Sequence, residues 1–410
     1  MDRRGPRALA LVVLFAACAR GAPVPQPSTT EVAAPAGPDS GEPFLVASAG
    51  PTGEPTAYLS WLERVGEGVH ELRLASFDGS GWSSPSVIER SSAIMANWAD
   101  FPSVAVAADG ALWAHWLERG GEGGYGIRIA RSSDRGVTWS EPWTPHEDAS
   151  ATEHGFVAAI PLGEGPVGGM AFAWLDGRAF ASTGASAREE TALYFRVMGA
   201  DGPSSPETPI DPRACDCCQV DAATAATGPV LVYRDRSPQE IRDIHVVRWS
   251  RGAWTDPRPV HVDGWETGAC PVNGPAVDAA GDRVVVAWFT AAAGSPRVKV
   301  AFSDDSAESF DEARVVDDGD PAGRVDVVLL EDGSALVSWL ERAEGDASEV
   351  RVRRVAPDGR TSPSARVSVG LGERAGGVSR MARLGDGALV AWTDASETVT
   401  RVRVALVEVE

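Results

Sequence analysis

The sequence predicts an all-β protein, a β-propeller of four-stranded antiparallel blades. One phrase, a hydrophobic strand that ends in an aromatic residue followed by polar residues, occurs seven times in the 410 residues, at a spacing of between 50 and 60 residues. The aromatic residues are Trp61, Trp116, Trp174, Tyr233, Trp288, Trp339 and Trp392. Such a period is typical of an array of one supersecondary unit. Beyond residue 44 the chain shows short runs of Val, Ala, Leu and Trp broken by Gly, Pro, Asp and Ser, without a helical pattern.

The N-terminus reads as a targeting segment. Three arginines precede an apolar run, residues 8–17, which is too short to span a membrane and fits a signal peptide of residues 1–17. LFAAC resembles a bacterial lipobox, which implies a lipid on the sulfur of Cys18; an ordinary signal peptide is the alternative. The Pro-, Ala- and Ser-rich residues 18–43 predict a disordered tether, and residues 44–410 one propeller domain. We expect the protein outside the cytoplasm, lipid-anchored in the periplasm or at the cell surface.

The charge of the chain limits its partners. The formal net charge is -21, and Lys299 is the sole lysine. An acidic surface of this size repels phosphate backbones and anionic headgroups, so we expect no nucleic acid and no membrane contact except through a lipid anchor. A few clustered arginines would still make a locally positive pocket. We expect a monomer that binds a small polar or carbohydrate ligand and uses no cofactor.

Residues 100–146 illustrate one blade. Strands are predicted at residues 102–108, 111–118 and 126–132, and a short fourth strand near Trp143. Four antiparallel strands repeated around an axis make a propeller blade. Seven copies predict seven blades, with a six-bladed ring as the alternative. The last unit has only three evident strands, so its fourth strand must come from elsewhere, for example from the segment just before Phe44.

The turn at residues 132–139, SSDRGVTW, matches the pattern S-x-D-x-G-x-T-W. Its specified residues are Ser132, Asp134, Gly136, Thr138 and Trp139. Degenerate copies occur at residues 76–82 and 303–310. With this box the chain resembles the sialidase-like BNR/Asp-box propellers over residues 44–410. The Asp accepts turn hydrogen bonds and the Gly supplies a permissive backbone angle, and in that family the box faces away from the active site. The box therefore concerns the fold and not catalysis.

Polar residues at the start of each first strand are expected to line a central funnel. These are Asn97, Asp100, His154, Gln219, Asp221, Asn273, Asp326 and Arg380. Asp176 and Arg178 follow the third aromatic residue, and the fourth unit has Tyr-Arg-Asp-Arg where others have Trp-Leu-Glu. Its loop carries Arg234, Arg236 and Arg242 together with Asp235, Glu240 and Asp243. These arginines would hold a polar or carboxylated ligand by bidentate contacts; the alternative is a solvated loop of weak ion pairs.

Four cysteines remain when Cys18 is set aside. Cys215, Cys217 and Cys218 precede the first strand of the fourth unit, and Cys270 precedes that of the fifth. An even number in an oxidising compartment predicts two disulfides. Of three pairings, Cys215–Cys218 with Cys217–Cys270 is favoured because the other two require a cramped or strained ring. A copper or zinc thiolate site is the alternative, but C-x-C-C is not a standard zinc spacing, and we predict no metal.

The resemblance implies a set of catalytic residues that the sequence provides only in part. Sialidases of this fold use three arginines, a Tyr–Glu pair, an Asp near the funnel and an Arg-Ile-Pro stretch, which is absent here. The arginines above would form the triad, and Asp176, Asp235, Glu240 or Asp243 a catalytic carboxylate. Tyr58 and Tyr194 fall in strands, Tyr125 in a Gly-rich loop and Tyr233 at the core aromatic position. No catalytic residue is assigned beyond these candidates.

Three functions stay open. The leading hypothesis is an extracytoplasmic sialidase-like propeller lipoprotein that binds a polar or glycan-derived ligand in the funnel at the fourth and fifth units. The second is an exo-acting glycoside hydrolase of the exo-α-sialidase type with a divergent active site. The third is a structural or protein-interaction propeller.

Overall fold

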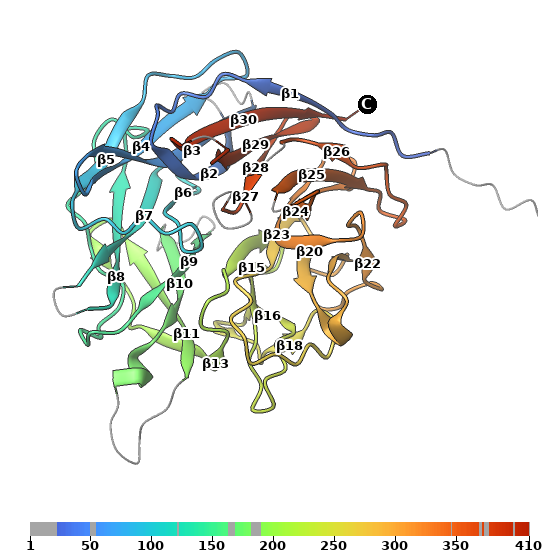
Figure 1. The fold of residues 1–410 in the computed structure, drawn as a ribbon. Coiled ribbons are helices and arrows are strands. Elements are labelled where there is room, and N and C mark those ends of the chain that lie inside the picture. Colours follow the sequence, from blue (N-terminus) through green and yellow to red (C-terminus); the bar gives the residue numbers. More distant parts are fainter. Residues whose placement is uncertain are drawn as a thin grey trace, which may run out of the picture.

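The computed structural model describes residues 23–409, apart from 50–54, 121–122, 163–168, 182–189, 346, 369–370, 373–376 and 397. In this part of the chain, seven antiparallel sheets surround a central axis (Figure 1). The predicted seven-bladed propeller is confirmed, which decides against six blades. The expected signal peptide and Cys18 lie outside the described residues. None of the described helices is long and apolar enough to cross a membrane.

Each blade runs from an inner strand at the axis to an outer strand at the rim. The inner strands are β2 (Ser40–Ala49), β6 (Ser103–Val106), β9 (His154–Pro161), β14 (Asp221–Ala225), β19 (Ala276–Ala280), β23 (Pro321–Leu329) and β28 (Arg380–Leu384). The second strands are β3 (Pro55–Gly66), β7 (Leu112–Arg119), β10 (Met170–Asp176), β15 (Gly228–Arg234), β20 (Arg283–Thr290), β24 (Ala335–Arg342) and β29 (Gly387–Asp394).

The third strands are β4 (Val69–Phe77), β8 (Tyr125–Ser132), β11 (Thr191–Gly199), β16 (Ile244–Ser250), β21 (Arg297–Ser303), β25 (Ala347–Val355) and β30 (Arg401–Glu408). The outer strands are short and some are split: β5 (Ser86–Ser91), β12 (Gly202–Pro203), β13 (Thr208–Ala214), β17 (Ala253–Trp254), β18 (Arg258–Pro259), β22 (Arg314–Val315), β26 (Ala365–Arg366) and β27 (Leu371–Gly372). Blade two completes its sheet with a bridge between Ile129 and Trp143. Among the described residues, the 3₁₀ turns η1 (Arg178–Ala181) and η3 (Ala292–Gly294) lie in loops.

The N-terminal part of the described chain closes the ring. Strand β1 (Ser28–Val32) pairs antiparallel with β30, with Thr30 opposite Leu406. The seventh blade thus takes its fourth strand from the segment before Phe44, as expected. The prediction of a disordered tether over residues 18–43 is wrong for β1 and for residues 40–43, which begin β2. Composition suggested disorder, but the open edge of β30 supplies the partner that a five-residue strand needs to form.

The repeated phrase has a structural cause. Each of its aromatic side chains is buried, at most 3% exposed. Residues two apart in a strand point to one face, and a buried indole N–H needs an acceptor. In four blades the carboxylate two residues after the Trp accepts its N–H: Glu63 at 3.2 Å, Glu118 at 3.1 Å, Asp176 at 2.8 Å and Glu341 at 2.5 Å. The Trp-x-Glu spacing therefore reflects a hydrogen bond inside the core.

Aspartates on or beside the inner strands join neighbouring blades. An inner strand has one edge without a ladder partner, so its N–H groups need other acceptors. The carboxylates of Asp100, Asp221, Asp278 and Asp326 accept the N–H groups of Phe156, Val277, Leu329 and Met381 in the next blade, at 2.5–2.9 Å. They border an axial cavity of about 580 Å³. Burial raises the pKa of Asp100 to about 7, and those of Asp278 and Asp326 to about 6.

The turn after β8 forms the hydrogen bonds that its sequence predicts. The Ser132 hydroxyl donates to Asp134 at 2.8 Å, and both the N–H and hydroxyl of Thr138 donate to that carboxylate at 2.9 and 2.6 Å. Gly136 has φ 85°, where a side chain is strained. These contacts are internal to the turn and leave no group for chemistry.

Candidate functional site

Arg234, the centre of the predicted ligand loop, is a structural residue. It is 2% exposed, and its guanidinium donates to the carbonyl oxygens of Asn273 at 2.9 Å, Arg242 at 2.6 Å and Phe289 at 2.7 Å. The guanidinium also lies 4.8 Å from the ring centre of Trp265. These contacts tie blade four to blade five and leave Arg234 no free face for a ligand.

The rest of the blade-four loop is an ion-pair network around Glu240. Arg213, Arg236 and Arg242 all contact this carboxylate, at 2.9–3.0 Å. Hydrogen bonds from Arg236, followed by those from Arg242, hold the pKa of Glu240 at about 2. Two interpretations of this loop followed from the sequence. A loop of ion pairs describes it better than an open arginine clamp does.

The remaining carboxylates of this loop also serve the fold. Asp243 accepts the backbone N–H groups of Gly264 and Trp265, at 2.9 and 3.0 Å. Asp235 lies 3.7 Å from His245, and burial, assisted by the charge of Asp211, raises its pKa to about 6. Neither lines the hollows described below.

Asp176 and Arg178 form a closed pair in blade three. The Asp176 side chain is fully buried and accepts hydrogen bonds from Trp174, His154 and Arg178. Burial alone would raise its pKa, but the hydrogen bonds from His154 and Arg178 lower it strongly. Arg178 also binds Glu207 and stacks 4.1 Å over the ring of Tyr194.

Two predicted ligand residues lie nearer the axis. The Asn273 side chain is satisfied: its N–H₂ donates to Pro271 and Ala322, and its oxygen accepts the Arg324 N–H at 2.7 Å. Arg380 borders the axial cavity, 3.5 Å from Asp326 and 4.7 Å from the ring centre of Phe44. Arg236 and Arg242 share Glu240, whereas Arg178, Arg234 and Arg380 have partners of their own, and the expected convergence on one ligand is absent among the described residues.

The funnel candidates divide into two groups. Asp100, Gln219, Asp221, Asp326 and Arg380 do border the axial cavity. His154 instead sits between Asp148 and Asp176, at 3.2 and 3.0 Å, and stacks on His146. Asn97 does not border the axial cavity and instead lines two other hollows.

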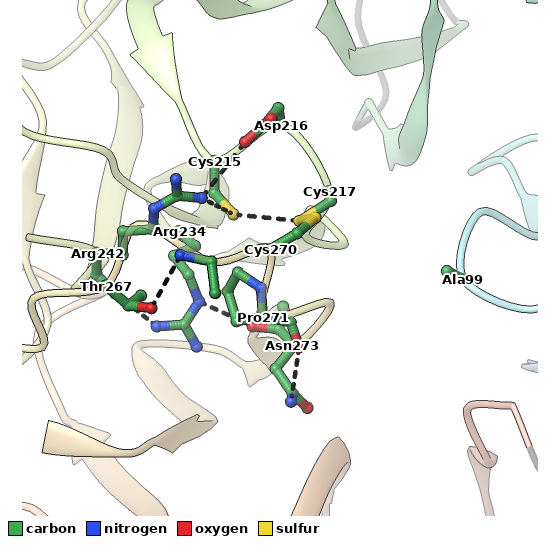
Figure 2. Close-up of a disulfide and its surroundings, with 12 residues drawn as sticks. Ala99, Cys215, Asp216, Cys217, Arg234, Arg242, Thr267, Cys270, Pro271 and Asn273 are labelled. Atoms are coloured by element: carbon green, nitrogen blue, oxygen red, sulfur yellow. Dashed lines mark hydrogen bonds and ion pairs between the residues drawn. A yellow bond between two sulfur atoms is a disulfide. The ribbon is translucent and has the colours of Figure 1, made fainter. Parts of the chain in front are cut away.

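The cysteines lie together as the repeat map predicted (Figure 2). Cys217 and Cys270 form a disulfide between the loops that precede β14 and β19. The second expected bridge, Cys215–Cys218, is absent: both residues are buried thiols. The prediction of a second disulfide from the even number of cysteines is therefore wrong for Cys215 and Cys218. Burial protects these two thiols from oxidants that reach the surface.

A better candidate site lies on the same face, between blades two, three and four. Two hollows of about 550 and 610 Å³ adjoin there, which we call the paired hollow. Both are lined by Tyr125, Glu153, Phe156 and Asp216. The first is also lined by Trp98, Arg119 and Cys217, and the second by Leu175 and Phe180. Aromatic rings and carboxylates therefore share one concave surface.

Tyr125 and Glu153 line the paired hollow, and the buried Asp100 lies next to Tyr125 on the side of the axial cavity. Tyr125 begins β8 and bridges Glu153, and its N–H donates to Thr152 at 3.2 Å. Burial raises the pKa of Tyr125, and the negative charges of Asp100 and Glu153 raise it further. The phenol thus keeps its proton beside two carboxyl groups, one buried and one exposed.

Backbone features hold these side chains in place. A Cβ on Gly155 would lie 2.0 Å from the Asp100 carboxylate and 2.8 Å from the Tyr125 ring, so a glycine is required. Phe156 has φ 52° at a bulge in β9, where the register against β10 shifts. Bulges re-aim side chains and are frequent beside functional sites.

Sequence reasoning missed this group. Asp100, Tyr125 and Glu153 come from three separate segments of blades two and three. The repeat map could have placed Glu153 beside the predicted funnel residue His154, because both precede the third inner strand. Tyr125 was assigned to a Gly-rich loop, and nothing in its spacing indicated the carboxylates that it meets.

No protein-family model matches this chain, and no curated protein sequence matches it. Solved structures with a similar fold include a point mutant of the NanB sialidase from Streptococcus pneumoniae, 8% identical over 92% of this chain and 94% of that chain, with TM-score 0.50. A leech intramolecular trans-sialidase is 11% identical over 87% of this chain and 83% of that one, with TM-score 0.47. A protein of unknown function from Dyadobacter fermentans is 14% identical over 91% and 95%, with TM-score 0.47. The fold is that of sialidase-type propellers, and at these identities the similarity concerns the fold alone.

Proposed function

We propose that this chain is an extracytoplasmic sialidase-like propeller lipoprotein that binds a polar, glycan-derived ligand in the paired hollow. The observation that carries the proposal is the combination of aromatic rings and carboxylates on one concave surface. The Arg324 guanidinium lies 4.2 Å over one face of Trp98. The other face of Trp98 and the ring of Tyr125 suit the C–H face of a sugar ring, and Glu153 and Asp216 are acceptors for hydroxyl groups. Concave sites with few convergent polar groups are typical of small-molecule binding.

The charge of the paired hollow favours a neutral or cationic ligand. Among the described lining residues, Arg119 is the one arginine, and its Nη1 donates to the Ile94 carbonyl at 2.9 Å. Glu153 and Asp216 add two carboxylates to the lining, of which Asp216 pairs with Arg242 at 3.3 Å, so Glu153 carries the negative charge of the hollow in a chain of formal net charge -21. A carboxylated sugar would meet like charge here. This proposal moves the site away from the arginines of blade four and changes the expected ligand accordingly.

Binding of neutral oligosaccharides, amino sugars and sialosides to the purified protein, measured by calorimetry, tests the site. We expect Glu153→Gln and Tyr125→Phe each to weaken binding of the ligand found by about tenfold, the effect of one lost hydrogen bond. Glu240→Gln, in the blade-four loop, is the control and leaves affinity unchanged.

Each contrary outcome has a definite meaning. Loss of binding with Glu240→Gln, but not with Glu153→Gln, would place the site at the blade-four rim. Strong preference for sialosides would contradict the charge argument. Absence of any sugar binding would reject the proposal in favour of a structural or protein-interaction propeller.

The position of Tyr125 supports a second candidate, a glycoside hydrolase. A phenol beside an exposed carboxylate is an arrangement in which the Tyr125 oxygen attacks the anomeric carbon while Glu153 accepts its proton. The glycosidic bond breaks in this step and its electron pair leaves with the aglycone oxygen, after which water hydrolyses the glycosyl–Tyr125 intermediate. For this candidate, Tyr125→Phe abolishes hydrolysis of aryl glycosides but retains binding. Failure of the unaltered protein to hydrolyse any aryl glycoside in a broad panel would exclude it.

The lipoprotein part of the proposal is supported by the apolar run before Cys18 and the LFAAC sequence. Mass spectrometry of the mature protein tests it directly. A lipid-modified peptide beginning at Cys18 supports the anchor, whereas an unmodified N-terminus elsewhere rejects it.

A further inference from the structure

Four sulfur atoms gather where blades four and five meet, at the edge of the paired hollow. Cys217 forms the disulfide with Cys270, and the free thiols of Cys215 and Cys218 lie beside it. The sulfurs of Cys215, Cys217 and Cys218 all lie within 4.8 Å of one another. The sulfur of Cys215 is 3.9 Å from that of Cys217 (Figure 2). A free thiol therefore lies next to a sulfur of the disulfide, close to van der Waals contact.

Cationic groups surround the free thiol. Nη1 of Arg242 lies 3.4 Å from the Cys215 sulfur, and Arg242 is itself 3% exposed. Burial alone would raise the pKa of Cys215, but a hydrogen bond with Cys218 and the charges of Arg234 and Arg242 outweigh it and lower the pKa. Burial and the neighbouring Cys215 raise the pKa of Cys218. Of the two free thiols, Cys215 therefore loses its proton at the lower pH.

The two cysteines of the disulfide differ in exposure. Cys215 and Cys218 are at most 1% exposed, Cys217 is half-buried, and Cys270 is exposed. A buried thiolate can therefore reach Cys217 from inside, while Cys270 faces solvent on the other side. Reagents in solution meet Cys270 before they meet either free thiol.

We propose that these cysteines form a thiol–disulfide exchange site, in which Cys215 attacks Cys217 and releases Cys270 as a solvent-facing thiol. The Cys215 thiolate forms a bond to the Cys217 sulfur while the Cys217–Cys270 bond breaks, and the electron pair of the broken bond leaves with Cys270. The Cys270 thiolate then takes a proton from water. One disulfide and two thiols exist before and after the step, so no external oxidant or reductant is required. The Cys215–Cys217 bridge closes the ring that the sequence spacing disfavours as cramped, so the exchanged form is the minor one and accumulates only as Cys270 reacts.

This exchange is independent of the proposed sugar site, although Cys217 lines part of the paired hollow. The substrate class is a disulfide that reaches the released Cys270 thiol, such as a small disulfide in solution. Attack by the Cys270 thiolate forms a mixed disulfide, and the electron pair of the broken S–S bond leaves with the second sulfur of the substrate as a thiol. The adjoining Arg234 and Arg242, which the sequence suggested as ligand clamps, would act here by stabilising the Cys215 thiolate.

Alkylation tests the exchange in the protein purified without reductant. Iodoacetamide traps Cys270 whenever it is released, and peptide mass spectrometry then locates the alkylated cysteine and the remaining bridge. We expect alkylated Cys270 together with a Cys215–Cys217 bridge, forming faster at about pH 8 than at about pH 6 because the thiolate attacks. In Cys215→Ser, Cys270 labelling should be at least about tenfold slower. Cys218→Ser, a matched control in the same buried cluster, still labels Cys270.

Three results would overturn the exchange. The first is equal labelling of Cys270 in Cys215→Ser and the unaltered protein. The second is absence of the Cys215–Cys217 bridge in the unaltered protein, a result that needs no variant to fold. The third is a Cys215–Cys218 bridge beside Cys217–Cys270, which leaves no thiol to attack.

Discussion

At the scale of single residues, the most conspicuous polar groups of the sequence bind the protein itself. Arg234 holds three backbone carbonyls, and Asp243 holds two backbone N–H groups. Glu63, Glu118 and Glu341 accept the indole N–H of the Trp two residues before them. A buried polar group must find partners inside the protein, so chemical variety in a sequence is not by itself a sign of a ligand.

A substitution at Arg234 measures this structural role. Arg234→Met removes the partner of three buried carbonyls, and we expect it to lower the free energy of unfolding by about 3–5 kcal/mol. Arg236→Met is the matched control: Glu240 keeps Arg213 and Arg242, so the loss should stay below about 1 kcal/mol. Denaturant unfolding provides the comparison. Equal effects of the two variants would contradict the structural role of Arg234.

At the scale of elements, the ring closes through one short strand. β1 covers the edge of β30 with five paired residues, and its Thr29 hydroxyl donates to the Arg366 carbonyl at 3.0 Å. Without β1, the edge of β30 would offer unpaired backbone groups to other chains. The polar, Thr-rich β1 suits an edge position, and its pairing explains why this part of the expected tether is ordered.

Proline in β1 tests the closure. Successive residues of a strand turn their N–H groups to opposite sides, so changing both Thr29 and Thr30 to Pro removes a bond to β30 whichever residue supplies it. We expect a loss of roughly 2 kcal/mol in stability and the appearance of oligomers on size-exclusion chromatography. Ala33→Pro, just beyond β1, should change neither. A monomer of unaltered stability after the double change would show that β1 contributes little to closure.

At the scale of the whole molecule, buried carboxyl groups around the axis link stability to pH. Burial raises the pKa of Asp100 to about 7 and those of Asp278 and Asp326 to about 6. Glu42 lines a separate hollow, and burial raises its pKa to about 7 as well. Folding favours the protonated form of each, so their contribution is present at low pH and is lost as the pH rises through these values. The pKa of Glu240 is lowered to about 2, so its contribution to stability is present above about pH 4 and is lost as the pH falls below that value.

Thermal unfolding across a pH series tests this linkage. Burial lowers the pKa values of His115 and His146 to about 3 and about 4, so these histidines oppose the carboxyl groups below about pH 6.5. We therefore expect stability to be greatest at about pH 5–6.5 and to fall by roughly 2 kcal/mol by pH 8. Asp100→Asn keeps an acceptor for the Phe156 N–H but cannot ionise, so its stability should depend less on pH. A maximum at pH 8 in the unaltered protein would contradict the assigned pKa directions.

Several features followed from local pattern alone. The spacing of the repeated phrase predicts seven blades because each unit must bury its aromatic face against the next. The turn at Ser132 is predictable because its hydrogen bonds connect residues at most four apart. The Cys217–Cys270 bridge was also within reach, since the repeat map places both on neighbouring loops.

The tertiary structure decided everything that depends on which side chains meet across blades. Gly155 allows Asp100 and Tyr125 to approach, and the parallel bridge brings Glu153 beside Tyr125. Burial kept Cys215 reduced next to Cys217, and three backbone carbonyls took up the guanidinium of Arg234. The sequence by itself determined the repeating unit, because strand pairing and turns are local. The candidate site was decided only by the closed ring, because its groups lie on separate segments whose approach depends on packing and not on spacing along the chain.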